Sequence, residues 1–107
     1  KSNIRPDAAA ELDKIVQVLK DNPAISIELG SHTDARASAS YNLKLSQRRA
    51  ESAVKYIIEH GIEAVRIKAK GYGETQLING CSDGVDCSEE AHQENRRTEF
   101  KITDLND

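Results

Sequence analysis

Three short segments of this chain alternate apolar and polar residues, and two amphipathic helical patterns precede or separate them. Strict alternation is typical of a β-strand with one buried face, and helical spacing of apolar residues is typical of a helix packed on a core. The expected elements are a helix from Pro6 to the stop at 21–23, a strand at 24–30, a helix from Asn42 to His60 capped by Gly61, a strand in 66–73, a short helix at 88–95 and a strand at 96–103. This order predicts an α+β fold, a two-layer sandwich with the helices on one face of a mixed β-sheet.

The length and the charge of the chain limit its function. At 107 residues it is expected to form a single domain, 1–107, with a modest core. A net charge of −3 supplies no overall field that attracts nucleic acid, and one Phe with three Tyr is too few for a base-stacking surface. No apolar run approaches the ~18 residues of a membrane span. We therefore expect no nucleic-acid partner, and membrane association only through parts of a parent protein outside this chain.

A loop and the helix that follows it carry the most distinctive polar residues. Asn42, Leu45 and Arg49 are spaced i, i+3 and i+7, which places them in one stripe of the helix about 60° wide. The preceding loop carries Thr33 and Asp34. The helix is therefore expected to present an amide, an apolar side chain and a guanidinium beside a carboxylate.

Asp34 and Arg49 allow two interpretations. As a surface ion pair they contribute about 0 to 1 kcal/mol, and spacing alone favours this interpretation. If both point into one groove without pairing, the carboxylate faces an ammonium and the guanidinium takes an α-carboxylate, which matches the head of a free amino acid. In that case Asn42 completes the cradle and Leu45 covers the aliphatic part of the ligand.

Cys81 and Cys87 lie in the polar loop NGCSDGVDCSEE. A disulfide between them would stabilise the chain by about 2 kcal/mol, and it favours an oxidising compartment. A zinc site with His92 is the alternative, but its spacing departs from the tight C-x2-4-C pattern of zinc sites.

Two further sets of residues have the types, but not the arrangement, of other sites. Ser31, His32 and Asp34 are the residue types of a hydrolase, but neighbours on an extended segment point in opposite directions and no G-x-S-x-G elbow is present. His32 and Asp34 lack a third metal ligand. Four acids of the cysteine loop are compatible with calcium, although a solvated acidic loop is favoured: Asp83, Asp86, Glu89 and Glu90. We expect no enzyme activity, no metal and no cofactor.

Several sequence blocks in a fixed order resemble the OmpA-like peptidoglycan-binding domain. That domain occurs at the C-terminus of outer-membrane porins, in peptidoglycan-associated lipoproteins and in flagellar-motor stator proteins. The blocks are HTD at 32–34, NLKLSQRRA at 42–50, GYGE at 71–74 and NRR at 95–97. Together they are far more specific than any one short motif, and the resemblance covers nearly the whole chain.

The resemblance implies that the partner is peptidoglycan, bound at the meso-diaminopimelate of its stem peptide, whose side chain ends in an ammonium and a carboxylate. The residues it implies are Asp34 and Arg49 on the head group, with Asn42, Leu45 and Thr33 beside it and Arg97 near the groove. It also implies a periplasmic location, as part of an outer-membrane-associated protein that is tethered to the cell wall. A structural or oligomerisation domain without direct wall binding is the alternative.

Three features depart from the family pattern. Members commonly carry glycine before HTD and again a few residues later, where this chain has Ser31 and Ala37. The family fold, of β-α-β-α-β-β type, also begins with a strand ahead of the first helix. We expect that strand to be truncated at Lys1, which leaves a sheet edge open to pairing with another chain. The loop at 79–91 exceeds that of the shortest members, and we interpret it as a stapled surface loop.

Overall fold

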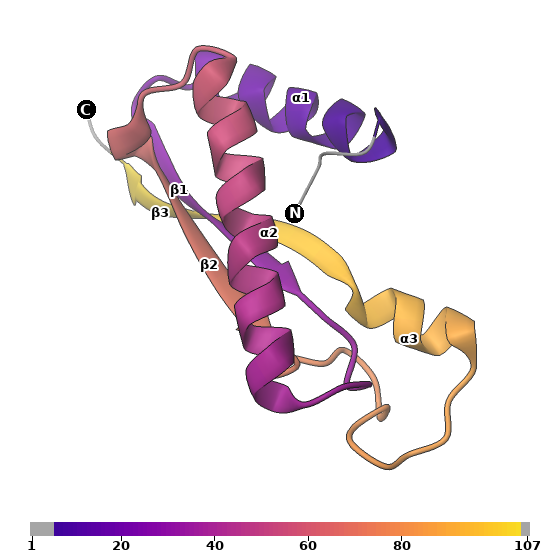
Figure 1. Ribbon diagram of the computed structural model, residues 1–107. Helices are drawn as coiled ribbons and strands as arrows, with labels where there is room; N and C mark the ends of the chain where they lie inside the picture. Colours follow the sequence, from indigo (N-terminus) through magenta and orange to yellow (C-terminus); the bar gives the residue numbers. More distant parts are fainter. Residues whose placement is uncertain (1–5, 106–107) are drawn as a thin grey trace.

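The helices and strands follow one another in the predicted order, as Figure 1 shows for the computed structural model, which describes residues 6–105. Their bounds are α1 Pro6–Asp21, β1 Ile25–His32, α2 Ala39–Glu59, the 3-10 turn η1 Ala64–Arg66, β2 Ile67–Gly73, α3 Glu89–Asn95 and β3 Arg97–Leu105. Helix α2 lies along the sheet. Helix α1 lies near the C-terminal end of α2, and α3 lies at the opposite end of the molecule. The strand expected ahead of the first helix concerns residues before Pro6, outside the described range. Between residues 6 and 105, no helix has the length and apolar character that a membrane span requires.

The sheet is mixed, with the strand order β2-β1-β3. Strand β1 pairs in parallel with β2 and antiparallel with β3. It runs through Ser31 and His32, which were expected in a loop, because the backbone of both residues pairs with a neighbour on each side. Ser31, for example, lies opposite Gly71 of β2 and Thr98 of β3. With this extension of one strand, the α+β fold class is confirmed.

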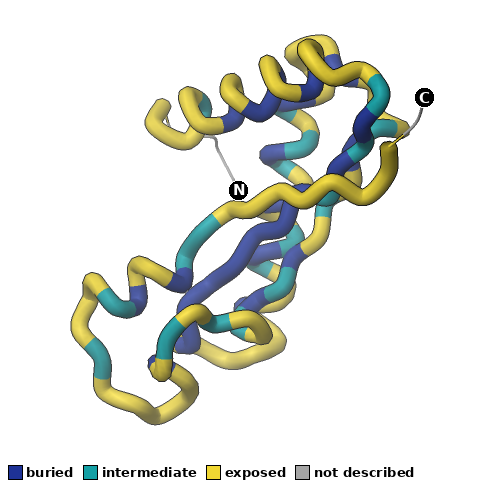
Figure 2. Tube along the Cα trace, turned by 180° about the vertical axis from the view of Figure 1, so that it is seen from behind, coloured by how far each residue is buried: buried dark blue, intermediate teal, exposed yellow. Residues whose placement is uncertain are grey.

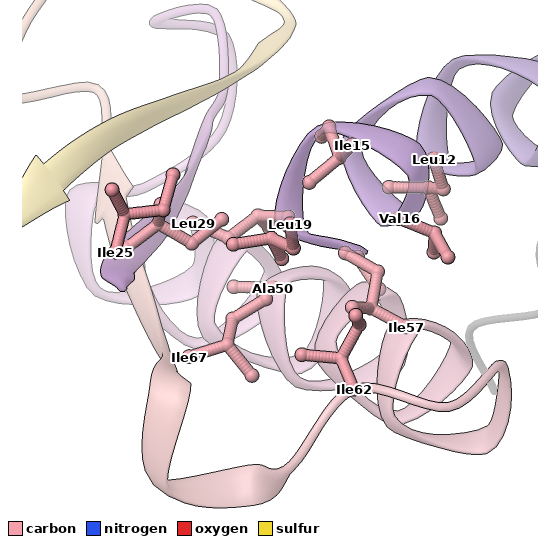
Figure 3. Close-up of a cluster of buried hydrophobic side chains, with 12 residues drawn as sticks. Leu12, Ile15, Val16, Leu19, Ile25, Leu29, Ala50, Ile57, Ile62 and Ile67 are labelled. Carbon is pink, nitrogen blue, oxygen red and sulfur yellow. The ribbon is translucent and has the colours of Figure 1, made fainter. Parts of the chain in front are cut away.

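One hydrophobic core fills the space between the helices and the sheet. Its buried residues are Leu12, Ile15, Val16 and Leu19 of α1, Ile25, Ile27 and Leu29 of β1, Ala50, Ala53 and Ile57 of α2, and Ile62 and Ile67. In Figure 3 the labelled side chains of α1, β1 and α2 point toward one another. Figure 2 shows that the central strand β1 is buried along most of its length, whereas the edge strand β3 is exposed. The backbone of the central strand is therefore hydrogen-bonded on both sides and largely shielded from solvent.

Helix α2 begins at Ala39 instead of Asn42, because Ser38 caps it. The Ser38 hydroxyl oxygen accepts a hydrogen bond from the backbone N–H of Tyr41 at 3.1 Å, which satisfies one of the unpaired donors of the first turn. Residues 39–41, which were expected in the loop, are thus the first residues of the helix.

Two glycines of β2 bring the strand directly against α2. A Cβ atom on Gly71 would lie 2.2 Å from the backbone nitrogen of Gln47. The backbone N–H of Gly73 donates a hydrogen bond to the Ser46 hydroxyl at 2.8 Å. The first turns of α2 are therefore fixed against the end of the sheet from which the loop at residues 33–38 emerges.

Cys81 and Cys87 form the predicted disulfide. Asn79 connects this loop to α3, because its amide donates to the Ala91 carbonyl at 2.8 Å and its carbonyl accepts from the Asn95 amide at 2.8 Å. The two sulfur atoms are bonded to each other, so neither is a thiolate ligand for zinc. The loop and α3 form one hydrogen-bonded unit.

Ala37 has a backbone φ of 98°, and no other non-glycine residue in the described range has a positive φ. The family pattern that the sequence resembles was expected to have glycine near this position. A left-handed conformation costs an L-residue about 1 to 2 kcal/mol. The loop therefore keeps the backbone path of a glycine-containing loop, with alanine in a strained conformation.

Candidate functional site

Asp34 lies just after β1, and its carboxylate is nearly buried. The residue is 7% exposed. Oδ1 accepts a hydrogen bond from the backbone N–H of Arg36 at 3.0 Å, and Oδ2 accepts from Arg36 Nη2 at 2.9 Å and from Arg96 Nη1 at 2.5 Å. Asp34 thus has two arginine partners that the sequence did not indicate, Arg36 two residues along the chain and Arg96 62 positions away.

Glu89 joins the same two arginines on their outer side. Its Oε1 accepts from Arg36 Nη1 at 2.9 Å, and its Oε2 accepts from Arg96 Nη2 at 2.5 Å. The two acids and two arginines thus form a closed ring of ion pairs, which we call the ion ring. The side chain of Asp34 is 10% exposed and that of Glu89 is 63% exposed, so the ring extends from the protein interior to solvent.

The ion ring keeps both carboxylates ionised. Burial of Asp34 opposes ionisation, but the hydrogen bonds from Arg36 and Arg96 outweigh it and hold the pKa of this carboxyl well below its usual range. Hydrogen bonds from Arg96 and Arg36 also lower the pKa of Glu89. At neutral pH the four side chains of the ring therefore carry no net charge.

Thr33 and Asn42 are buried and hold the backbone of Asp34. The Thr33 hydroxyl donates to the Asp34 carbonyl at 2.9 Å, and the Asn42 amide donates to the same carbonyl at 3.2 Å. Asn42 also donates to Glu74 Oε1 at 2.9 Å. A hydrogen bond with Asp83, together with burial, raises the pKa of Glu74. The structure thus places Thr33 and Asn42 where they position the loop.

Arg49 and Leu45 lie on the α2 stripe predicted from the sequence. Leu45 is half-buried and Arg49 is exposed. Within residues 6–105, the Arg49 side chain makes no hydrogen bond and no ion pair. The surface ion pair between Arg49 and Asp34, which spacing alone favoured, is therefore not formed.

Arg96, and not Arg97, is the arginine of the NRR block that contacts Asp34. Arg96 is the C-cap of α3, whereas Arg97 is the first residue of β3. Arg97 Nε donates to Glu99 at 2.6 Å, on the same side of the strand, and Arg97 Nη2 donates to the Gln76 carbonyl at 3.0 Å. The structure thus places Arg97 outside the ion ring.

Arg36, Glu89 and Arg96 belong to the ion ring, although the sequence did not predict these roles. Arg36 carried a usable signal, because an aspartate often accepts a hydrogen bond from the backbone two residues later. Glu89 carried none, since it lies 53 positions from Arg36 and was grouped with the solvated acids of the cysteine loop. Its place in the ion ring depends on where α3 packs.

Comparison with known proteins gives the family of this chain. Residues 1–91 match the model of the OmpA family. The chain belongs to the OmpA family. A crystal structure of the peptidoglycan-associated lipoprotein from Burkholderia pseudomallei superimposes on this OmpA-family domain with a TM-score of 0.79 and 25% identity, over 92% of this chain and 80% of that one.

Relatives of this OmpA-family domain are longer proteins. The domain is 38% identical over 104 residues to a protein from Gloeobacter violaceus named photosystem I P700 chlorophyll a apoprotein A2, of which it covers 12%. It is 34% identical over 82 residues to the peptidoglycan-associated lipoprotein of Rhizobium meliloti, of which it covers 47%. The chain spans less than half of the length of either relative. Each name therefore describes a longer protein, of which only one part is similar to this chain.

Proposed function

We propose that this OmpA-family domain binds peptidoglycan non-covalently by holding the diaminopimelate head group of the stem peptide. In this role it tethers the outer membrane or an envelope complex to the wall, in the periplasm, as part of an outer-membrane-associated protein. The names of two relatives, both peptidoglycan-associated lipoproteins, support the wall as partner. The domain then acts as an anchor and performs no catalysis.

This proposal depends most on the Asp34 carboxylate, which is ionised and has a hydrogen-bond acceptor position that the protein does not fill. A carboxylate offers about four acceptor positions. The protein fills three of them, one from the Arg36 backbone, one from the Arg36 guanidinium and one from Arg96. Asp34 thus remains ionised with acceptor capacity to spare, and we assign the remaining position to the ammonium of diaminopimelate.

Residues of α2 supply the second half of the proposed site. The exposed guanidinium of Arg49 has no partner between residues 6 and 105, so it is available to bind the carboxylate of the head group bidentately. The half-buried Leu45 lies on the same helix stripe and covers the methylene groups of the ligand. Thr33 and Asn42 fix the loop, and Arg97 is assigned the rim of the groove.

A site of this kind binds one stem peptide weakly to moderately. Each charge-assisted hydrogen bond contributes about 1.5 to 3 kcal/mol before the entropy of binding is subtracted. Several such domains on one membrane meet many stems of one polymer, so avidity provides firm attachment. A sub-nanomolar affinity for a single soluble stem peptide would contradict this proposal.

Purified cell-wall sacculi provide the direct test. Wild-type domain should sediment with sacculi, and free meso-diaminopimelate should release it. Asp34→Asn and Arg49→Ala should each lose most of this retention, whereas Arg48→Ala, which removes a neighbouring exposed guanidinium, should retain it. Full retention of both site variants, or no competition by diaminopimelate, rejects the proposal. Self-association without retention would instead favour an oligomerisation domain.

A further inference from the structure

The ion ring contains a carboxylate that is bound in the way a ligand would be bound. Each oxygen of Glu89 accepts a hydrogen bond from a different arginine, at 2.9 Å from Arg36 and at 2.5 Å from Arg96. Two guanidinium groups that each donate to one oxygen form a receptor for a planar carboxylate. Glu89 therefore shows which chemical group this pair of arginines accepts.

Glu89 can leave this place without disturbing the fold. Its side chain is 63% exposed, whereas that of Arg96 is 24% exposed. It is the first residue of α3, and Ser88 caps that helix independently by accepting a hydrogen bond from the Ala91 N–H at 3.1 Å. Since exposed ion pairs contribute little to stability, rotation of Glu89 into water is inexpensive.

The charges of the ring favour replacement of Glu89 by another anion. If Glu89 withdraws, Asp34 still balances one of the two arginines, and one positive charge remains. Arg36 and Arg96 stay in place because both also donate to Asp34, at 2.9 and 2.5 Å. The position that Glu89 vacates thus attracts a single carboxylate. Arg36 and Arg96 separate this position from Asp34, to which the ammonium is assigned.

We propose that Arg36 and Arg96 form a second carboxylate subsite, that Glu89 fills it in the free domain, and that a stem-peptide carboxylate outside the diaminopimelate side-chain head displaces Glu89 on binding. This inference rests on the proposed function, because it assumes the same ligand. Glu89 then acts as an internal competitor that lowers the affinity and restricts it to peptides that carry the additional carboxylate.

Calorimetric titration with two soluble stem peptides tests this subsite. Both end in meso-diaminopimelate, and in one of them the carboxylates outside the side-chain head are amidated. Glu89→Gln should bind the free peptide about two- to five-fold more tightly than wild type, the range expected when an exposed ion pair is removed as competitor. Its affinity for the amidated peptide should equal that of wild type. Glu90→Gln, which removes a neighbouring exposed charge from α3, should match wild type with both.

A spectroscopic measurement covers the case in which Glu89→Gln perturbs α3. In wild-type protein, the ¹³C shift of the Glu89 carboxylate should move toward the value of a solvated glutamate as the free peptide saturates the domain. If the peptide binds but this shift stays constant, or Glu89→Gln binds no more tightly than Glu90→Gln, the subsite is rejected and wall binding stands. If wild type retains neither peptide nor sacculi, both proposals fail.

Discussion

Arg96 donates a hydrogen bond to Asp34 over 2.5 Å, although 62 positions separate the two residues in the sequence. This contact connects the end of the central strand β1 to the segment between α3 and β3. It also makes the state of the Asp34 carboxylate depend on the last third of the chain.

Replacement of this arginine should raise the pKa of Asp34. In Arg96→Gln the carboxylate keeps only Arg36, so less of the interaction that offsets its burial remains. Arg97→Gln is the matched control, since Arg97 pairs with Glu99. The ¹³C shift of the Asp34 carboxylate followed against pH gives both pKa values. Equal pKa values in the two variants would mean that Arg96 does not stabilise the ionised form.

The depressed pKa of Asp34 should make the domain less stable in acid. The folded-state pKa lies below the unfolded value of about 3.9, so the contribution of this group is fully present above that value and is lost as pH falls through the folded pKa. Asp34→Asn cannot titrate. The difference in unfolding free energy between wild type and Asp34→Asn should therefore shrink steadily below about pH 4. Urea unfolding between pH 2 and 7 measures it, and a constant difference would contradict the ion ring.

Ala37→Gly should stabilise the domain by about 1 kcal/mol, because glycine adopts a positive φ without strain. The larger entropy of glycine in the unfolded chain reduces this gain. Ala10→Gly, in the exposed part of α1, should instead destabilise by about 1 kcal/mol. Chemical denaturation of the two variants gives the sign of each effect, and a destabilising Ala37→Gly would rule out a strained loop.

Gly71→Ala should destabilise the domain by about 1 to 3 kcal/mol, since its new methyl group would overlap the backbone of α2 at Gln47. Gly80 has no heavy atom within 4 Å of the position its Cβ would take, so Gly80→Ala should be nearly neutral. Thermal melting compares the two. Gly71→Ala should also reduce sacculus binding, because displacement of α2 moves Asn42 and Arg49 relative to Asp34. A neutral Gly71→Ala would contradict the close packing of β2 and α2.

Periodicity predicted the fold but not the ion ring. The local geometry of a helix or a strand sets the spacing of its apolar residues. The spacing in α1 and α2 and the alternation in β2 and β3 can therefore be read directly from the sequence. The alternation of apolar residues in β1 ends at Leu29, so it does not predict that Ser31 and His32 belong to the strand, which follows from their pairing with β2 and β3. The ion ring depends on contacts between residues 53 and 62 positions apart, which no local pattern encodes. The choice between Arg96 and Arg97 likewise depends on where α3 ends.

The central position of β1 has a mechanical consequence. Asp34 lies two residues beyond the end of a strand that is hydrogen-bonded to β2 on one side and to β3 on the other. A pulling force applied at Asp34 along the strand direction loads both ladders in shear, so many hydrogen bonds must break together, whereas an edge strand pulled sideways loses them one at a time. Under the proposed function, the wall would thus hold the domain next to a segment of its fold that resists extraction from both sides.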